Sequence, residues 1–417
     1  MTSAGNALNR FAVVATVVSS LVACAGSSVT KPVDDVPFLE RSHTQEIDGV
    51  SITAAVPSAA ESVELFGTPL YKKGVQPVWL EISNDTGNWI SFLPAGLDED
   101  YLSPLEVASV SRSAKDRNSA EKFFFQTGLD LQIAAGETRK GFIFTSLDEG
   151  TKAFNIDIIG DSRSWQFTFF IQVPGLAIDH HDIDFGSLYA DEEITHYSDA
   201  ELFRDALKAL PCCTMDAASK NNGDPVNLVI IGEPADIYYA AIRAGWDETE
   251  VVSAASGFKT AMSFITGGEY RYSPVSNLYV FGRSQDVALQ RIRSSINERN
   301  HFRLWLAPMT FQGRSVFIGQ ISRDIGVRLT TKTITTHKID ANVDETREFL
   351  VENLAYHQML NKLAYAEGVG MAAFDAPRQN LTGDPYYTDG LRVVMWIEKT
   401  PTDLQDIGSE DWIWPDD

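Results

Sequence analysis

Residues 165–173 read Trp-Gln-Phe-Thr-Phe-Phe-Ile-Gln-Val, and this stretch decides the fold of the front half of the chain. Its alternating large apolar side chains are Trp165, Phe167, Phe169, Ile171 and Val173. A period of two is typical of a β-strand with one buried face. Similar runs occur at residues 50–56, 78–82, 89–93, 129–133, 141–144 and 154–158, with turn sequences between them. We therefore predict an antiparallel, immunoglobulin-like β-sandwich over residues 43–176.

The back half of the chain has a different pattern. It contains Asn227-Leu-Val-Ile-Ile-Gly232-Glu-Pro-Ala-Asp236 and, fifty residues later, Asn277-Leu-Tyr-Val-Phe-Gly282-Arg-Ser-Gln-Asp286. Each motif predicts an apolar strand, a glycine turn and the start of a helix, with the two strands equivalent in one sheet. The second helix is expected to bury Ala288, Ile292 and Ile296. We predict an α/β domain with a mixed sheet over residues 223–400, so the whole chain is an α+β multidomain protein.

Composition limits the class of protein further. The 417 residues are 44% hydrophobic and carry 57 acidic side chains against 34 Lys and Arg, a formal net charge of −23. This composition excludes a mainly disordered chain and a multi-span membrane protein. The excess of negative charge also argues against a nucleic-acid partner, because the phosphate backbone would repel it.

The beginning of the chain predicts a targeting signal. Arg10 precedes an apolar run over residues 11–23, which is too short for a membrane-spanning helix and suits a signal peptide. Leu21-Val-Ala-Cys24 resembles a bacterial lipobox, which implies cleavage before Cys24 and acylation of its thiol; Ala25 favours sorting to the outer membrane. The alternative is an ordinary secretory signal with a chance cysteine. We expect a signal peptide at 1–23 and a tether at 24–42.

Other segments carry weaker signals. Residues 177–222 are expected to form a linker with a helix that stops at Pro211, and residues 401–417 an acidic tail. A disulfide between the neighbours Cys212 and Cys213 would close a strained ring, so two partly buried thiols are expected. The His180-His181 pair, flanked by aspartates, could chelate a metal, but a solvated linker is favoured because adjacent side chains diverge in an extended chain.

Several short motifs of the back half occur in an order that resembles a known family. They are Gly282-Arg-Ser-Gln-Asp286, His301-Phe-Arg-Leu-Trp305, Ser322-Arg-Asp-Ile-Gly326 and Thr336-His-Lys-Ile-Asp340, followed by Asp344. Residues of about 224–364 are similar to the LssY C-terminal domain family. In some relatives the domain follows a membrane-embedded type 2 phosphatidic acid phosphatase or a DedA-like part, so the resemblance implies an envelope context; it supplies no activity. Relatives often have His where Lys338 stands, which weakens a metal site built on a His pair.

The same motifs contain the candidate site residues. His301, Asp324 and His337 are candidates for general acid–base catalysis. The candidate anion-binding residues are Arg283, Arg303 and Arg323, with Arg283 placed beside amides of the expected helix start. Asp340 and Asp344, together with His337, could hold a hydrated divalent cation. The structural alternatives are helix caps, a buried ion network, a core histidine and a local partner for Arg283.

Two functions remain open. The favoured hypothesis is a lipid-anchored envelope protein that binds an anionic ligand or a membrane partner without catalysis. The alternative is a hydrolase that acts on phosphorylated or acylated envelope material through an Arg/His/Asp pocket. No nucleophile elbow, HExxH, GxGxxG or Walker loop is present, so neither a serine hydrolase, a zincin nor a nucleotide site is indicated. The sequence indicates no particular cofactor.

Overall fold

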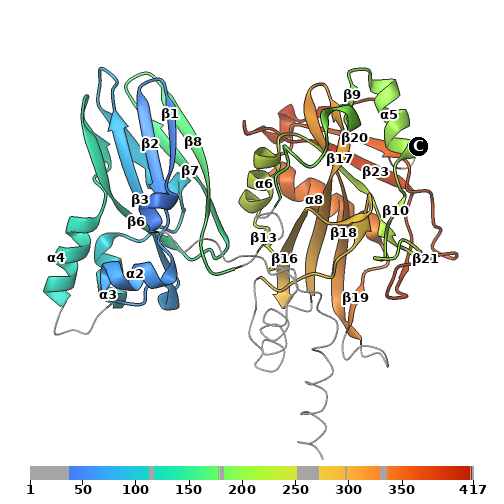
Figure 1. Ribbon diagram of the computed structural model, residues 1–417, viewed down its shortest axis with the longest axis horizontal. Helices are drawn as coiled ribbons and strands as arrows, with labels where there is room; N and C mark the ends of the chain where they lie inside the picture. Colours follow the sequence, from blue (N-terminus) through green and yellow to red (C-terminus); the bar gives the residue numbers. More distant parts are fainter. Residues whose placement is uncertain are drawn as a thin grey trace, which may run out of the picture. The chain divides into compact units, whose positions relative to one another are not determined.

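The computed structural model describes residues 37–111, 117–176, 178, 183–250, 272–295, 298–328, 336–413 and 415. Contacts divide the chain into two units (Figure 1). The N-terminal unit spans residues 32–181 together with 235–243, and the C-terminal unit spans residues 182–234 and 244–417. Cys24, the predicted signal peptide, most of the tether and the His180-His181 pair lie outside the described residues.

The N-terminal unit contains two antiparallel sheets. The first, ordered β1-β2-β3-β6, comprises β1 (His43–Ile47), β2 (Val50–Ala55), β3 (Val75–Asn84) and β6 (Thr138–Ser146). The second, ordered β5-β4-β7-β8, comprises β5 (Gln132–Ile133), β4 (Ile90–Leu93), β7 (Thr151–Ile159) and β8 (Ser164–Gln172). The runs with a period of two therefore form antiparallel strands, as predicted, except that the run at residues 129–133 contributes only Gln132–Ile133.

One hydrophobic core joins the two sheets. Ile52 and Leu80 of the first sheet and Phe167 of the second are fully buried in the same cluster. These side chains reach the core because every second residue of a strand points to the same face. Burying each of them stabilises the fold by about 1.5–3 kcal/mol.

Short helices that the period analysis did not predict extend this unit. They are α2 (Ala59–Phe66), α3 (Pro104–Ser111) and α4 (Arg117–Thr127). Ser58 begins α2 with a capping box, because its side chain accepts from the Glu61 amide while Glu61 accepts from the Ser58 amide. Phe66 stacks on Phe124 at 5.6 Å, and both rings pack with Phe144 in a second core.

Helix α6 (Pro234–Arg243) begins at a proline, as the sequence predicts. Its contacts group residues 235–243 with the N-terminal unit. Tyr239 lies 6.2 Å from the ring of Phe170, and the Asn155 amide donates a hydrogen bond to the Tyr239 hydroxyl.

The C-terminal unit is built on a mixed sheet, which confirms the predicted α+β class. Its main path runs β13-β16-β17-β18-β12-β23-β20-β24, and β12 pairs with β23 in parallel. The strands are β13 (Asp247–Glu248), β16 (Val287–Ser295), β17 (Glu298–Phe311), β18 (Arg314–Arg328), β12 (Leu228–Ile231), β23 (Leu391–Trp396), β20 (Lys362–Glu367) and β24 (Gly408–Ser409). β9 (Thr195–Tyr197) pairs with β17, and β19 (Thr336–Ile339) pairs with β18.

Smaller elements complete the description. One small sheet, ordered β11-β10-β14-β15, comprises β11 (Asn222–Pro225), β10 (Cys213–Met215), β14 (Tyr279–Val280) and β15 (Arg283–Ser284). The strands β21 (Arg378–Gln379) and β22 (Pro385–Tyr386) pair with each other. The 3₁₀ helices are η2 (Phe38–Arg41), η3 (Tyr71–Lys73), η4 (Pro94–Gly96), η7 (Asp191–Glu193) and η8 (Leu404–Asp406). Among the described helices, none has the length and apolarity needed to cross a bilayer.

Two helices of the C-terminal unit pack on opposite faces of the large sheet. α5 (Ala200–Ala209) buries Phe203 in a cluster with Trp305 of β17. α8 (Val343–Tyr356) contacts β18 from the other face, where its Glu345 pairs with Arg323. α5 ends before Pro211, as predicted.

The second strand–turn–helix prediction is wrong. Tyr279 and Val280 form β14 of the small sheet, so this strand is not equivalent to β12 in the large sheet. The expected helix over Ala288 and Ile292 is strand β16. Spacings of four residues are even, so they place side chains on one face of a strand as well as on one face of a helix.

Candidate functional site

His301, Arg303 and Asp324, which the sequence nominates, lie on the same face of the large sheet. His301 and Arg303 stand opposite Ser322 and Gln320 in the β17–β18 ladder. Trp305 continues this face into the hydrophobic core. Beyond Trp305 the face becomes a buried polar layer of residues that are less than a tenth exposed: Gln290, Arg299, His301, Arg303, Gln320, Ser322 and Asp324.

An ion pair forms one end of the buried polar layer. Arg299 Nε donates to Asp324 Oδ2 at 3.1 Å, and Arg299 Nη1 donates to the Ser273 carbonyl at 3.1 Å and to Gln290. His301 Nδ1 lies 3.7 Å from the same Asp324 oxygen. Sequence reasoning missed Arg299, although its position two residues before His301 places it on the same strand face.

Arg303 forms the other end of the layer. Its Nε and Nη2 donate to the Ser276 carbonyl at 3.1 and 2.9 Å, and its Nη1 donates to Gln320 at 2.9 Å. These bonds compensate part of the cost of removing the guanidinium from water. The nominated residues His301, Arg303 and Asp324 therefore lie in one buried polar layer, in which Arg303 and Asp324 each make hydrogen bonds and His301 lies beside Asp324.

Arg323 does not join this network. It lies one residue from Asp324, so its side chain points to the opposite face of the sheet. There it donates to Glu345 at 2.8 Å and to Asn300 at 3.3 Å, and it lies 5.7 Å from the ring of Phe349. The three nominated arginines therefore do not form one anion site.

Arg283 has a local acidic partner. It binds both oxygens of Asp286 at 2.9 Å, and it also donates to the Tyr189 hydroxyl at 2.6 Å and the Leu306 carbonyl at 2.7 Å. The predicted anion pocket at a helix start is wrong, because the chain beyond Arg283 forms strand β16 and offers no helix terminus.

The nominated metal ligands Asp340 and Asp344 accept hydrogen bonds from different parts of the chain. Asp340 accepts a hydrogen bond from the backbone N–H of Asn342 at 3.0 Å. Asp344 accepts from the backbone N–H of Asp389 at 2.6 Å and from the Thr388 hydroxyl at 2.7 Å. The helix cap is Asn342, whose side chain accepts from the Glu345 amide. Within the described residues, no three His, Cys, Asp or Glu side chains gather to hold a metal.

Only the backbone of His337 lies within the described residues. It pairs with Val327 in the β18–β19 ladder, and its side chain lies outside the described residues. Its predicted catalytic role stays a prediction.

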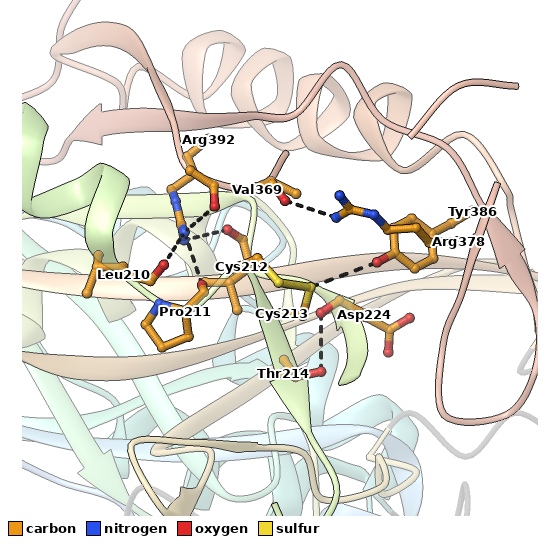
Figure 2. The surroundings of a disulfide bond; sticks show 12 residues. Leu210, Pro211, Cys212, Cys213, Thr214, Asp224, Val369, Arg378, Tyr386 and Arg392 are labelled. Carbon is orange, nitrogen blue, oxygen red and sulfur yellow. Dashed lines mark hydrogen bonds between the residues drawn. A yellow bond between two sulfur atoms is a disulfide. The ribbon is translucent and has the colours of Figure 1, made fainter. Parts of the chain in front are cut away.

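A feature that the sequence argument judged improbable is present in the C-terminal unit. Cys212 and Cys213 form a disulfide between neighbouring residues (Figure 2). Cys213 is 3% exposed, and Cys212 is partly exposed. The expectation of two free thiols is therefore wrong. Residue types alone do not predict the ring that this disulfide closes, because its formation depends on the conformation of the surrounding backbone.

A cavity of about 470 Å³ opens beside this disulfide. We call it the disulfide cavity; its lining residues are Cys212, Cys213, Asn222, Val369, Arg378, Gln379 and Tyr386. Its size falls within the range of small-molecule sites. Among the described residues that line it, none is acidic, whereas a guanidinium, two amides and a phenol supply hydrogen-bond donors.

The polar groups of the cavity are held in place by the chain around them. Arg378 is half-buried, and its Nη1 donates to the Val369 carbonyl at 3.0 Å. The Tyr386 hydroxyl lies 4.0 Å from Cys213 Sγ and is the donor in this contact, because a disulfide sulfur carries no proton. Burial raises the pKa of Tyr386 even though Arg378 opposes the shift, so the phenol keeps its proton at neutral pH.

Arg392 fixes the backbone that carries the disulfide. This side chain is fully buried, and its Nη2 donates to the carbonyls of Leu210 and Pro211 at 3.1 and 3.0 Å (Figure 2). Further bonds reach Val226 at 2.8 Å and Gly368 at 3.1 Å. Burial lowers the pKa of Arg392 to about 10, which still leaves the guanidinium charged at neutral pH.

Asp224 connects the cavity electrostatically with the buried polar layer. Burial raises the pKa of this carboxyl group, while the hydrogen bond from Asn380 at 3.1 Å and the charge of Arg303 oppose the shift. The charge of Asp224 in turn raises the pKa of Tyr386 at the cavity. Arg303 of the buried polar layer and Tyr386 of the cavity are thus both coupled electrostatically to Asp224.

The comparison with known families agrees with the motifs. Residues 207–391 match the family model described as LssY C-terminus, so the resemblance is confirmed for this part of the chain. The matched stretch includes the buried polar layer and every residue that lines the disulfide cavity. No curated protein matches the chain.

We predict that Asp324→Asn destabilises the C-terminal unit by roughly 3–5 kcal/mol, because it leaves the buried Arg299 without its carboxylate. The control is Glu398→Gln, which removes a half-exposed pair with Arg314 and should cost less than about 1 kcal/mol. Urea unfolding of both variants measures the difference. Equal losses would show that Asp324 and Arg299 form no strong pair.

We predict that Asp224→Asn becomes more favourable relative to the native chain as the pH rises. The folded-state pKa of Asp224 is raised, so its contribution to stability is fully present below about pH 3.9 and is lost as pH rises through the folded-state pKa. Asn stays neutral, and its carbonyl can still accept from Asn380. Unfolding free energies of both proteins from pH 4 to 7 test this; a constant difference contradicts it.

We predict that Gly368→Ala costs at least about 2 kcal/mol of stability. Gly368 has φ +142, and a Cβ there would lie 2.6 Å from Arg392 Nε. The matched control is Gly383→Ala, where φ is +79 and nothing lies within 4 Å of the added carbon. Thermal unfolding should show the larger loss at Gly368, and the reverse order would contradict the tight packing of Arg392.

Proposed function

We propose that this chain is a lipid-anchored protein of the cell envelope, held at the outer membrane through Cys24, whose C-terminal unit binds a small anionic ligand. The ligand site in this proposal is the disulfide cavity. Arg378 supplies the positive charge there, in place of the nominated Arg283, Arg303 and Arg323, which are engaged elsewhere. A carboxylate or a phosphate has the charge and the acceptor oxygens that such a site would bind.

The observation that carries this proposal is the composition of the cavity lining. Arg378 is the charged group of the lining, and the carbonyl oxygens that hold it leave its positive charge uncompensated by a carboxylate in that lining. The side chains of Asn222 and Gln379 are exposed, so their amides are accessible to a ligand.

The geometry of the backbone supports a fixed position for Arg378. Gly370 has φ +79, and a Cβ there would lie 3.0 Å from Arg378 Nη2. The glycine therefore lets the guanidinium approach the chain closely. A guanidinium that is held before binding loses less conformational freedom when the ligand arrives.

The hydrolase alternative has less support. It needs His301 or His337 beside an acid in a place that a substrate can enter. His301 and Asp324 are each less than a tenth exposed, and Asp324 already accepts a hydrogen bond from Arg299. The buried polar layer fits a structural network better than a hydrolytic centre.

We predict that Arg378→Gln weakens anion binding by about tenfold or more, because a hydrogen bond to a charged group contributes about 1.5–3 kcal/mol. Arg378→Lys keeps the charge but loses the planar fork, so it should bind with intermediate affinity. Titration calorimetry with inorganic phosphate and succinate as anions, and a neutral sugar as the reference, measures the affinity.

The matched control for charge is Arg314→Gln, which removes one arginine from a half-exposed ion pair with Glu398. It should leave the affinity unchanged. Binding of the anions that is equal in Arg378→Gln and in the native chain would contradict the proposed site, as would preference for the neutral sugar.

A further inference from the structure

We propose that the Cys212–Cys213 disulfide is a redox-active site, reduced and re-formed by exchange with thiols that enter the disulfide cavity. This activity goes beyond anion binding and does not depend on it. The ligand class is a thiolate, carried by a small thiol or dithiol reductant.

The position of the disulfide in the chain argues against an ordinary structural cross-link. A disulfide stabilises mainly by closing a loop in the unfolded chain, and the effect grows with the length of that loop. Cys212 and Cys213 are already joined by a peptide bond, so their disulfide removes very little freedom from the unfolded chain. Its contribution must therefore be sought in chemistry at the cavity that both residues line.

The two sulfur atoms are not equivalent. Cys212 is partly exposed, whereas Cys213 is 3% exposed and belongs to strand β10. An entering thiolate can therefore reach Cys212 more easily, and Cys213 is the leaving group. The rate of thiol–disulfide exchange depends on which sulfur the entering thiolate can reach.

The surroundings favour departure of Cys213 as a thiolate. The Tyr386 hydroxyl, 4.0 Å from Cys213 Sγ, can donate a hydrogen bond to the developing negative charge. Arg378 lines the same cavity and adds a positive charge (Figure 2). Hydrogen-bond donors and cations near a thiol stabilise its thiolate.

The backbone is held so that the reduced form can close again. Arg392 binds the carbonyls of Leu210 and Pro211, and the Val226 amide donates to the Cys212 carbonyl at 2.8 Å. Three successive carbonyls are thus anchored by groups that do not change on reduction. The two thiols stay adjacent, so closure is an intramolecular step.

Two successive attacks by thiolates reduce the disulfide. A thiolate RS⁻ attacks Cys212 Sγ, the bond between the two cysteine sulfurs breaks, and a mixed disulfide R–S–S–Cys212 forms while Cys213 leaves as a thiolate. A second thiolate attacks the sulfur of R, which releases RSSR and the Cys212 thiolate. The protein gains two electrons and, once both thiolates are protonated, two protons; the thiol reductant is oxidised to its disulfide.

The first test uses the full chain in its native state. Tryptic cleavage after Lys208 and Lys220 gives a peptide of residues 209–220 that contains Cys212 and Cys213, whereas Cys24 falls in another peptide. Excess dithiothreitol followed by iodoacetamide should add two carbamidomethyl groups to this peptide while circular dichroism stays native. Once the dithiothreitol has been removed, glutathione disulfide added before the iodoacetamide should restore the unlabelled peptide with its internal disulfide. Labelling only in denaturant, or in the untreated protein, would overturn the proposal.

The second test separates the two cysteines. Cys213→Ser should form a mixed disulfide with glutathione at Cys212 at least about tenfold faster than Cys212→Ser forms one at Cys213. Equal rates in folded variants would contradict the assigned roles. Because single-cysteine variants can fail to fold, the same question is put to the native sequence through Tyr386.

Tyr386→Phe removes the hydroxyl near Cys213 and should slow reduction by dithiothreitol about fivefold, as expected for the loss of a hydrogen bond worth about 1 kcal/mol. The matched control is Tyr387→Phe, at the neighbouring position whose ring packs on Phe374 and which does not line the cavity. An unchanged rate in Tyr386→Phe, or an equal change in the control, would remove the role of the phenol. Anion titration of the same variants tests the binding proposal separately.

Discussion

Four carbonyl oxygens surround the guanidinium of Arg392, and the C-terminal unit around the disulfide cavity depends on that contact. The acceptors come from the end of α5, the chain before β12 and the turn after β20, segments that are far apart in sequence. Burying a cation without a carboxylate is costly, and hydrogen bonds to a charged group offset this cost. The lowered pKa of Arg392 records the desolvation that the fold has to compensate.

Polar groups extend from this centre into the large sheet. Asp224 lies between two environments, because Arg303 of the buried polar layer lowers its pKa while its own charge raises the pKa of Tyr386 at the cavity. Burial dominates the pKa of Asp224 itself. The residues nominated from the motifs and the cavity found in the structure are thus electrostatically coupled, and the cavity, unlike the buried polar layer, offers space for a ligand.

The sandwich could be predicted because each of its strands carries its own signal. In residues 165–173 the alternation of large and polar side chains depends only on neighbouring positions, and Phe167 is buried as that pattern requires. β16 could not be assigned in the same way, since Ala288 and Ile292 fit one face of a helix or a strand equally well. Only pairing with β17 decides between them, and that pairing joins residues brought together by the fold.

The candidate site shows the same limit. The motifs nominated His301, Arg303 and Asp324, and strand alternation then placed these three together and Arg323 on the opposite face. Arg378 and Tyr386 carried no motif, because their meeting with Cys212 depends on a hairpin that lies about 170 residues later in the chain. Ring geometry alone argues against a disulfide between neighbours, because it takes no account of the carbonyl contacts of Arg392 that hold this backbone.

The change of character along β17, from hydrocarbon at Trp305 to paired charges at Arg299, has a consequence for how the chain can vary over evolution. A methylene lost from the hydrocarbon part leaves a small void that neighbours can partly fill. Loss of one charge from the charged part leaves the partner charge buried without compensation. Single replacements are therefore tolerated in the hydrocarbon part of β17. In the charged part, Arg299 and Asp324 have to change together, so homologous chains should show correlated substitutions at these two positions.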